Sequence, residues 1–458
     1  MVSARFTFID LFAGIGGFHA ALTAMGGKCV YAVEIDPAAA MVYERNWGLN
    51  PVGDITIDAS DDSMNVPEHD VLCAGFPCQP FSKSGAQRGM DETRGTLYWN
   101  ILRIIDERKP AVVLLENVRN LAGPRHLHEW QLIVETLRER GYRVSETPAI
   151  FSPHLLPREM GGRPQVRERV FITASRLPEG VGLSSQALPV TNNRPIAGWD
   201  PRTWDLESDL PLEDDTSEPG CELSESERLW IDAWDDFVQT MWEVRDGRRL
   251  PGFPLWADEW RNRTDLDPKR LKNEPKWKAD YLIKNAEFYS ANKKILDKWT
   301  RRWGVYTDAF PPSRRKFEWQ AQDTPRLWDA VMHLRPSGIR AKAPSYLPAL
   351  VAITQTSIIG SRDRRLSPRE AARLQGLPDW FDFGPQRTAS TYRQLGNGVS
   401  VGVVWHILRA HVRRDEDALK WTQPGLLKAA LGAPDSPDGI LAEMHAKGGK
   451  SPKRNSQS

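Results

Sequence analysis

The thiol of Cys78 stands in an unusual setting, between two prolines in the stretch GFPCQPFS at residues 75–82. Pro77 and Pro80 restrict the backbone φ angle and remove two N–H donors, so they predict a stiff local path. The apolar run Val71–Ala74 precedes this stretch and predicts a buried strand. A nucleophile at the carboxyl end of a parallel strand lies where α/β proteins bind ligands. Taken alone, Cys78 is equally consistent with a small apolar filler, as free cysteines often are.

A carboxylate and two guanidinium groups could act on the same substrate as this thiol. Glu116 follows the apolar run Ala111–Leu115, which predicts a buried parallel strand that ends at the edge where Cys78 lies. Arg167 and Arg169 alternate in sequence, which predicts that both point to one face of a strand. Taken singly, Glu116 is also typical of a helix cap or an ion pair, and the two arginines of a solvated strand edge.

The first strand leads into a glycine turn that predicts a cofactor site. Arg5–Leu11 is aromatic and apolar, and the turn Phe12–Gly17 (FAGIGG) joins it to a helix. In such a turn, backbone N–H groups and a helix N-terminus face the ligand, and glycine permits its close approach. Glu34 follows Gly14 by twenty residues, the separation typical of an acid that holds ribose hydroxyls in nucleoside-binding α/β folds.

The spacing of the glycines narrows the choice of cofactor. The pattern is G-x-G-G, and His19 stands where a dinucleotide-binding loop would have its third glycine. NAD is therefore disfavoured, and a cofactor without a pyrophosphate, such as S-adenosylmethionine, fits better. Asp54 is the acid that a third strand should deliver near an adenine.

Length and composition bound the class of protein. The 458 residues predict roughly two to three domains. Because 61 lysines and arginines almost balance 60 acids, a nucleic-acid partner must be held by local basic clusters. The four cysteines lack metal-ligand spacing, which is typical of a reduced, intracellular protein. The sequence shows no signal peptide and no long apolar segment, so we expect a cytoplasmic protein without a membrane span.

After Ser175 the α/β pattern stops and the sequence changes character. Asp205–Glu227 carries ten acids and no base, which predicts a solvated linker or insertion. Tryptophans recur from Leu229 to Trp328 and predict the core of a mainly helical insertion, with base stacking an alternative for one or two of them. Basic clusters that would contact phosphates lie at residues 245–249, 301–302 and 314–316.

Two arginines near the end of this interval are candidates for reading DNA bases. Arg335 and Arg340 flank a glycine in the segment Leu334–Arg340, which predicts a loop. Arginine is the usual bidentate reader of guanine in the major groove. A solvated loop without contact to bases is the alternative.

These segments together resemble the motifs of one family, the DNA cytosine-5 methyltransferases. FAGIGG, GFPCQPFS, ENV (residues 116–118) and QVRER (residues 165–169) occur in the family's order and at its separations. Later segments extend the resemblance, namely RLSPREAARLQG at residues 365–376 and QLGNGV at residues 394–399. The resemblance covers residues 5–175 and 362–410.

The resemblance implies a role for each catalytic candidate. Cys78 would be the nucleophile that adds to C6 of cytosine, because C5 is not nucleophilic enough to take a methyl group directly. Glu116 would hold the N3 and amino edge of the base, and Asn117 would help position that loop. Arg167 would contact O2 of the base, would also be the first candidate to favour the thiolate of Cys78, and would be supported by Arg169.

The resemblance also implies contacts to DNA and to the cofactor. Because C6 is unreachable inside a duplex, the target base must be flipped out, and the segment 79–97 would close over it. The DNA-binding candidates are Gln79, Ser82, Ser84 and Arg94, together with Arg335 and Arg340. The family's methyl donor is S-adenosylmethionine, and the cofactor-binding candidates are Phe12, Ala13, Gly14, Ile15, Gly16, Gly17, Glu34, Ile35, Asp54, Ile55, Pro77, Leu97 and Asn397.

The implied fold is α/β: a Rossmann-like methyltransferase sheet in a large catalytic domain, with a smaller target recognition domain inserted. We expect the catalytic domain over 1–190, the recognition domain with its acidic linker and Trp-rich insertion over 191–385, and the return to the catalytic domain over 386–421. Residues 422–458 are rich in Gly, Pro, Ser and Lys and predict a disordered tail. Ser367–Glu370 (SPRE) predicts a helix that starts with a capping box.

The implied function is transfer of a methyl group to C5 of a cytosine in a specific sequence of double-stranded DNA. The length leaves little room for regulatory domains, which favours a monomeric, bacterial-type modification enzyme that a cognate restriction endonuclease could accompany. One alternative is a family member acting on transfer RNA, although that branch is compact and this chain has a long insertion. Another is an inactive DNA-binding homologue, which the presence of Cys78, Glu116 and Arg167 argues against. The sequence that the enzyme recognises in DNA depends on the target recognition domain, which varies among family members.

Overall fold

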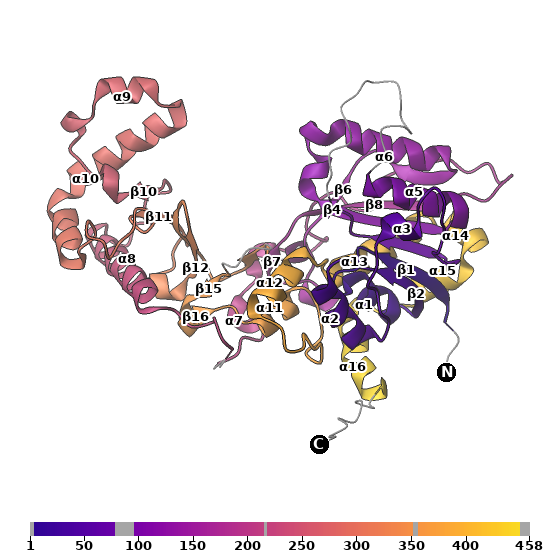
Figure 1. Ribbon diagram of the computed structural model, residues 1–458. Helices are drawn as coiled ribbons and strands as arrows, with labels where there is room; N and C mark the ends of the chain where they lie inside the picture. Colours follow the sequence, from indigo (N-terminus) through magenta and orange to yellow (C-terminus); the bar gives the residue numbers. More distant parts are fainter. Residues whose placement is uncertain (1–3, 78–95, 215–217, 351–355, 449–458) are drawn as a thin grey trace, which may run out of the picture.

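The chain folds into a large and a small lobe, joined at one end (Figure 1). The computed structural model describes residues 4–77, 96–214, 218–350 and 356–448. Both ends of the described chain lie in the large lobe, and the small lobe is formed by the middle of the sequence.

A mixed eight-stranded sheet forms the centre of the large lobe. Its strands are β1 (Phe6–Leu11), β2 (Gly27–Val33), β3 (Val71–Ala74), β4 (Val112–Val118), β5 (Tyr142–Ser145), β6 (Ala149–Phe151), β8 (Arg169–Arg176) and β9 (Gln186–Ala187). The order is β2-β1-β3-β4-β8-β5-β9, with β6 paired to β8. The first four strands are parallel, whereas β8 is antiparallel to β4, β5 and β6. This sheet confirms the predicted α/β fold.

Helices cover both faces of this sheet, which explains why β3 and β4 are apolar at almost every position. The helices of the large lobe are α1 (Gly17–Ala24), α2 (Pro37–Trp47), α3 (Ile55–Asp58), α5 (Leu97–Arg108), α6 (Leu127–Glu139), α11 (Pro368–Leu374), α12 (Thr388–Asn397), α13 (Val401–Arg414), α14 (Glu416–Thr422), α15 (Pro424–Leu431) and α16 (Asp438–Gly448). Val112 and Leu114 of β4 pack on one face with α1, α2 and α13. Val113 and Leu115 pack on the other face with α5 and α6.

Two distant stretches of the chain therefore build the large lobe. Helix α13 returns to pack against α1, and the approach is close because a Cβ on Gly17 would lie 2.7 Å from the carbonyl oxygen of Val399. A buried polar contact also joins α13 to β8, where Ser175 Oγ lies 2.9 Å from His411 Nε2. Asp415 lies 3.7 Å from the other ring nitrogen, and all three side chains are buried. No substrate can reach this Ser–His–Asp set, so its role is structural.

The end of the described chain is helical, which corrects the prediction of a disordered tail from residue 422. Helices α15 and α16 pack on the large lobe, and Leu426, Ala429, Ala430 and Leu441 are buried. Apolar residues at helical spacing outweigh the glycines and prolines here, because α13 offers an apolar surface that covers them.

The small lobe combines a six-stranded sheet with long helices. Its strands are β10 (Leu255–Trp256), β11 (Lys316–Gln320), β12 (Val331–Arg335), β13 (Gly338–Lys342), β15 (Ile358–Ile359) and β16 (Arg364–Arg365), and its helices are α8 (Glu225–Val244), α9 (Pro268–Asn273) and α10 (Lys276–Trp303). The order is β10-β11-β13-β12-β15-β16. In Figure 1 the helices lie on the side of this sheet away from the large lobe. Within Leu229–Trp328 the helices α8, α9 and α10 outweigh the short strands β10 and β11, which confirms the prediction of a mainly helical insertion; the other strands of the sheet follow this interval.

The tryptophans of the insertion mostly fill the core of this lobe, as predicted. Trp234, Trp260, Trp299 and Trp319 are buried, and Trp277 is 59% exposed. The acidic segment is not simply a solvated linker, because Leu206, Leu210, Cys221 and Leu223 within it are buried. It contains the short helix α7 (Leu206–Asp209), which packs beside the large lobe.

A small parallel pair of strands, β7 (Gln165–Val166) and β14 (Leu347–Pro348), lies between the lobes. Helix α11 begins with the predicted capping box, in which Ser367 and Glu370 each bond the other's backbone N–H.

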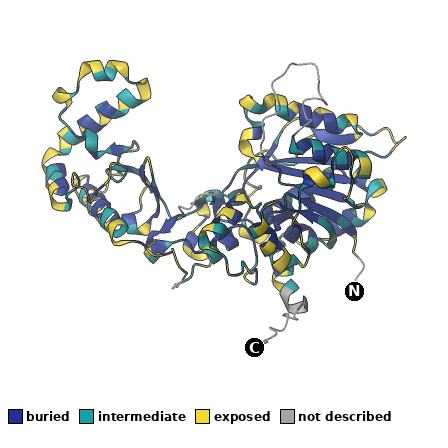
Figure 2. Cartoon of the chain, viewed as in Figure 1, coloured by how far each residue is buried: buried dark blue, intermediate teal, exposed yellow. Residues whose placement is uncertain are grey.

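In Figure 2 buried residues dominate the large sheet, and exposed residues dominate α9. No helix within the described ranges is long and apolar enough to cross a membrane, and these ranges contain no cluster of side chains that could hold a metal.

Candidate active site

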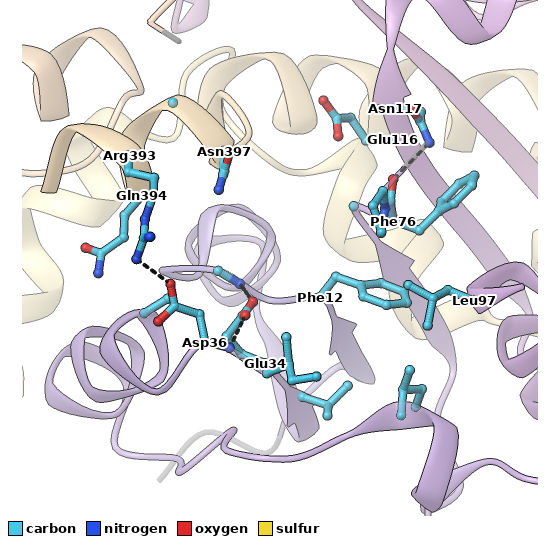
Figure 3. Close-up of a pocket in the computed structure, with 18 of the residues that line it drawn as sticks. Phe12, Glu34, Asp36, Phe76, Leu97, Glu116, Asn117, Arg393, Gln394 and Asn397 are labelled. Atoms are coloured by element: carbon cyan, nitrogen blue, oxygen red, sulfur yellow. Dashed lines mark hydrogen bonds and ion pairs between the residues drawn. The ribbon is translucent and has the colours of Figure 1, made fainter. Parts of the chain in front are cut away.

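A cavity of about 450 Å³ opens at the carboxyl ends of the parallel strands of the large lobe (Figure 3). The ends of β1, β2, β3 and β4 supply most of its wall, and α12 supplies the side formed by the returning chain. This is the edge at which α/β sheets bind ligands. The lining residues are Phe12, Gly14, Val33, Glu34, Ile35, Asp36, Ala39, Gly53, Asp54, Ile55, Gly75, Phe76, Pro77, Leu97, Glu116, Asn117, Val118, Arg167, Arg169, Arg393, Gln394, Gly396 and Asn397.

The glycine turn is held by the carboxylate of Glu34. One oxygen accepts a hydrogen bond from the backbone N–H of Gly14 and the other from that of Asp36, each at 2.8 Å. Phe12 has a φ of 56° and Gly14 of 55°, so the turn passes through the left-handed region, which is costly for a bulky residue. Each carboxylate oxygen has a second lone pair, so Glu34 can still accept from a ligand hydroxyl.

The structure brings together nine of the thirteen predicted cofactor residues. Phe12, Gly14, Glu34, Ile35, Asp54, Ile55, Pro77, Leu97 and Asn397 all line the cavity. Ala13, Ile15, Gly16 and Gly17 do not, because they face the interior behind the turn. A Cβ on Gly16 would lie 2.1 Å from Trp47 Nε1, which itself donates to the carbonyl of Ile15. These four residues shape the turn.

Sequence reasoning missed the ion pair between Asp36 and Arg393. Their side chains are 2.9 Å apart and join α2 to α12 across the mouth of the cavity (Figure 3). Asp36 also caps α2 by accepting from the N–H of Ala38. The Asp-Pro pair that starts α2 was a visible capping signal, but the partner lies 357 residues away and left no local sign.

Glu116 is a buried carboxyl group beside a cation. Arg169 Nε lies 3.0 Å from one oxygen of Glu116. Burial raises the pKa of Glu116 above its usual value, while the charges of Arg169 and Arg167 act in the opposite direction. A carboxyl group with a raised pKa can donate a proton nearer to neutral pH than an exposed one can.

Asn117 ties the end of β4 to the chain that leads toward Cys78. Its Nδ2 donates to the carbonyl of Phe76 at 2.9 Å, and its Oδ1 accepts from the N–H of Val118 (Figure 3). Phe76 is buried and packs against Tyr98. The position of the backbone at Phe76 and Pro77 is therefore fixed by β4.

Arg167 has a different environment from the one we predicted. Its guanidinium is buried and donates to the carbonyl oxygens of Leu350, Gly396 and Gly398 at 2.6–2.9 Å. Burial lowers its pKa to about 9, which leaves it protonated at neutral pH. Three of its five N–H groups are thus used in joining distant segments. This corrects the expectation that Arg169 supports Arg167, because it is Arg169 that pairs with Glu116.

Comparison with known proteins agrees with this arrangement. The profile of the C-5 cytosine-specific DNA methylases matches residues 6–413. The chain belongs to this family. Type II methyltransferase M.AluI of Cellulosimicrobium cellulans is 51% identical, over 97% of this chain and 99% of that protein. Type II methyltransferase M.HhaI of Haemophilus parahaemolyticus is 31% identical, over 87% and 92%. The Dnmt2 methyltransferase of S. pombe covers 89% of this chain and 99% of its own at 17% identity, but its TM-score of 0.45 is too low to carry an argument.

S-adenosylmethionine is the methyl donor of this DNA cytosine-5 methylase, and the cavity fits it. Ile35 is an exposed apolar side chain, 73% accessible, on the cavity wall, which a bound adenine would cover. Glu34 offers acceptors for ribose hydroxyls, and Phe12 and Leu97 add apolar surface. When bound, the cofactor supplies an activated methyl group.

Five predicted site residues of the methylase fall outside the described residues, namely Cys78, Gln79, Ser82, Ser84 and Arg94. Pro77, the last described residue before Cys78, lines the cavity.

Arg335 and Arg340 lie in the small lobe, on a β-hairpin rather than in the predicted loop. Both bond the same carboxylate, Glu318 of β11, at 2.7 and 2.9 Å. They line a second cavity of about 480 Å³ together with His333 and Lys342. Their contact with DNA remains a prediction.

We expect Glu34→Gln to weaken binding of S-adenosylmethionine roughly 10- to 100-fold, because an amide NH₂ cannot accept the N–H of Gly14 or Asp36. Isothermal titration calorimetry of the purified enzyme would measure this loss. Glu44→Gln, an exposed change on α2, is the matched control and should bind the cofactor like the wild type. Equal affinity of Glu34→Gln and wild type would show that Glu34 does not hold the cofactor turn.

Proposed function

We propose that this methylase modifies C5 of a flipped-out cytosine in a specific duplex DNA sequence, through a covalent bond between Cys78 and C6. The observation that carries the proposal is the placement of Glu116, with its raised pKa, in the same cavity as the glycine turn and Pro77. A methyl donor on the turn and a base held at Glu116 would share one enclosed space, whose wall includes Pro77, the residue before Cys78 in the sequence.

The proposed chemistry needs both a thiolate and a proton donor. The thiolate of Cys78 adds to C6, the electron pair of the C5–C6 double bond moves to C5, and N3 takes a proton from Glu116. After methyl transfer, the C5 proton passes to water and the N3 proton returns to Glu116. The C–S bond then breaks, which restores the double bond and the thiolate. The complete cycle returns Cys78 to a thiolate and Glu116 to its protonated form.

The described contacts favour Arg169 as the cation beside the base. It lies next to Glu116, whereas Arg167 uses most of its donors on backbone carbonyls. We therefore assign Arg167 to positioning of α12 and its neighbours, and Arg169 to orienting Glu116 and the base. Asn117 positions the chain before Cys78 through Phe76.

We further propose that DNA lies between the two lobes, with the small lobe as the target recognition domain. Arg335 and Arg340 alternate along β12 and β13 with Leu334 and Ile339, which pack in the core with the helices, so the two arginines lie on the opposite face of the sheet. In Figure 1 the helices lie on the side away from the large lobe. We propose that the enzyme acts as a monomer, because a single chain can supply the glycine turn, Glu116 and the returning helix α12 to one cavity.

The biological role we propose is protection of host DNA in a restriction–modification system, with a cognate endonuclease that acts on the same site. Support comes from two relatives that are named Type II methyltransferases, M.AluI and M.HhaI. This chain matches both of them over nearly their full lengths. Modification of host DNA places the enzyme in the bacterial cytoplasm.

Bisulfite sequencing of DNA from cells that express the enzyme should show protected cytosines at one position of one short recurring sequence. DNA from cells that express Cys78→Ser should show none, because the hydroxyl is a far weaker nucleophile than the thiolate. The same experiment supplies the recognition sequence. Unprotected DNA together with methylated transfer RNA would instead assign the enzyme to RNA.

Duplex DNA that carries 5-fluorocytosine at this position should form a denaturant-resistant adduct with the wild type and S-adenosylmethionine. Fluorine at C5 cannot leave as a proton does, so the C–S bond persists. Cys78→Ser should form no adduct. Cys29→Ser should form it normally, because burial raises the pKa of Cys29 to about 12 and makes that thiol a poor nucleophile. An adduct with Cys78→Ser would overturn the covalent role of Cys78.

The pH dependence of kcat/KM tests Glu116 as the proton donor. Activity should fall as pH rises through the pKa of Glu116, because the ionised carboxylate has no proton to give. Arg169→Gln removes a charge that lowers this pKa, so the alkaline limb should move to higher pH even if the rate drops.

Arg119→Gln is the matched control for this pH profile. Arg119 pairs with Glu168 at 2.8 Å and is largely exposed, so its removal should leave the alkaline limb in place. A limb that stays in place or moves to lower pH in Arg169→Gln would contradict the assignment of this limb to Glu116.

A further inference from the structure

The helices α9 and α10 of the small lobe carry a large excess of positive charge and form a basic arm, residues 268–303. Residues 268–303 contain eleven lysines and arginines but four acids, a formal charge of +7. Because the whole chain carries only +1, the remaining residues sum to −6. Surfaces that serve solubility alone mix both signs, so this segregation calls for a polyanionic partner.

Four lysines at the tip of this arm are exposed and have no ion pair with any described residue. They are Lys269, Lys272, Lys276 and Lys284. Other cations of the arm are neutralised within the lobe, through the pairs Arg270–Glu259, Lys278–Glu274, Lys293–Asp297 and Arg302–Asp236. Lys294 and Lys298 of α10 are also exposed and form no ion pair with a described residue, but Lys269, Lys272 and Lys276 lie together at the tip, where the first turn of α10 follows α9.

Aromatic side chains give this tip a firm base. Tyr281 packs against Trp256 and Trp277, with ring centroids 5.7 and 6.0 Å apart. The ammonium of Lys284 lies 5.8 Å from the ring of Tyr281 and 5.9 Å from that of Phe253. The start of α10, which carries Lys276 and Lys284, therefore stands on packed rings, which limits the entropy lost when these side chains bind a partner.

The arm is too far from the catalytic cavity to touch the target base. In Figure 1, α9 and α10 form the end of the small lobe that is most distant from the large sheet, and Figure 2 shows α9 as mostly exposed. Helix α10 is kinked at Asn292, so its first straight segment, residues 276–291, is about 24 Å long, comparable to roughly seven base-pair steps of duplex. A lysine ammonium is a point charge suited to phosphate and carries no base-reading geometry.

We propose that the basic arm, defined as residues 268–303, binds the phosphate backbone of duplex DNA outside the recognition sequence, through Lys269, Lys272 and Lys276. The inference rests on duplex DNA being the substrate. The arm would raise affinity for long DNA without changing which cytosine is methylated. It would also let a nearly neutral enzyme associate with DNA before it finds its site.

The test compares salt dependence of binding for the full-length wild type and the triple variant Lys269→Gln/Lys272→Gln/Lys276→Gln. Fluorescence anisotropy with a random-sequence duplex of about 40 base pairs would give log K against log salt, a slope that counts phosphate contacts. The slope of the variant should be shallower by about 2.7, since each lysine that contacts a phosphate contributes about 0.9. On a duplex of about 12 base pairs centred on the recognition sequence, the two slopes should agree.

The matched control is Lys28→Gln/Lys420→Gln/Lys428→Gln, which removes three exposed lysines from the large lobe. This control should keep the wild-type slope on the long duplex. An unchanged slope in the arm variant, or an equal loss in both triple variants, would overturn the proposal. The proposal would also be overturned if the arm variant lost affinity only for anionic vesicles or for single-stranded RNA.

If the proposed function is wrong, the results differ from those expected if only the proposed role of the arm is wrong. A wild type that methylates no DNA fails the methylation assay, whereas the salt slope on random-sequence duplex still reports the arm. The arm variant should methylate the short duplex at the wild-type rate, because its three lysines lie outside the catalytic cavity. A lower rate on the short duplex would assign these lysines to the site itself and contradict a flanking contact.

Discussion

The buried guanidinium of Arg167 is the interaction on which the assembled site depends. It donates to backbone carbonyls of Leu350, Gly396 and Gly398, which are 183 to 231 residues away in the chain. Removing one partner of a buried, hydrogen-bonded charge typically costs about 3–5 kcal/mol. The cost here would fall on the joint between the first half of the large lobe and the segment that returns from the small lobe.

That joint holds α12 in place as one side of the cavity. Helix α12, which ends at Asn397, supplies Arg393, Gln394, Gly396 and Asn397 to the cavity. The Asp36–Arg393 pair fastens the same helix to α2, but it lies at the surface and stabilises by about 1 kcal/mol or less. Of these two attachments of the returning segment to the first half of the large lobe, Arg167 is the buried and stronger one, and the apolar packing of α13 on α1 adds to it.

The sequence predicted the parts of the site that follow from local rules. The glycine turn, the apolar strands before Gly75 and Glu116, and the capping box at Ser367 are each visible within a few residues. The division of labour between Arg167 and Arg169 was not, because both line one cavity and only their distant partners distinguish them. The roles of Cys78 and the segment after it stay predictions, since these residues lie outside the described part of the chain.

Elsewhere the fold departed from expectation where tertiary packing decides. Strands β12 and β13 have only five residues each, and the Pro-Ser-Gly turn between them favoured a loop over Leu334–Arg340 instead of the hairpin that forms. Helices α15 and α16 are short and flanked by glycine and proline, so local composition pointed to disorder. Both form because a partner surface buries their apolar side, which a single-sequence pattern cannot show.

The electrostatics of Glu116 explain why two arginines flank one carboxyl group. A buried carboxyl without cations would hold its proton too firmly to give it up readily, and one in close contact with both guanidinium groups would be ionised at neutral pH. Here burial is the larger effect, and the charges of Arg169 and Arg167 only reduce it. Arg167 donates to backbone carbonyls, whereas Arg169 contacts the carboxyl group of Glu116 directly. The same guanidinium that assembles the cavity thus also offsets part of the rise that burial causes in the pKa of Glu116.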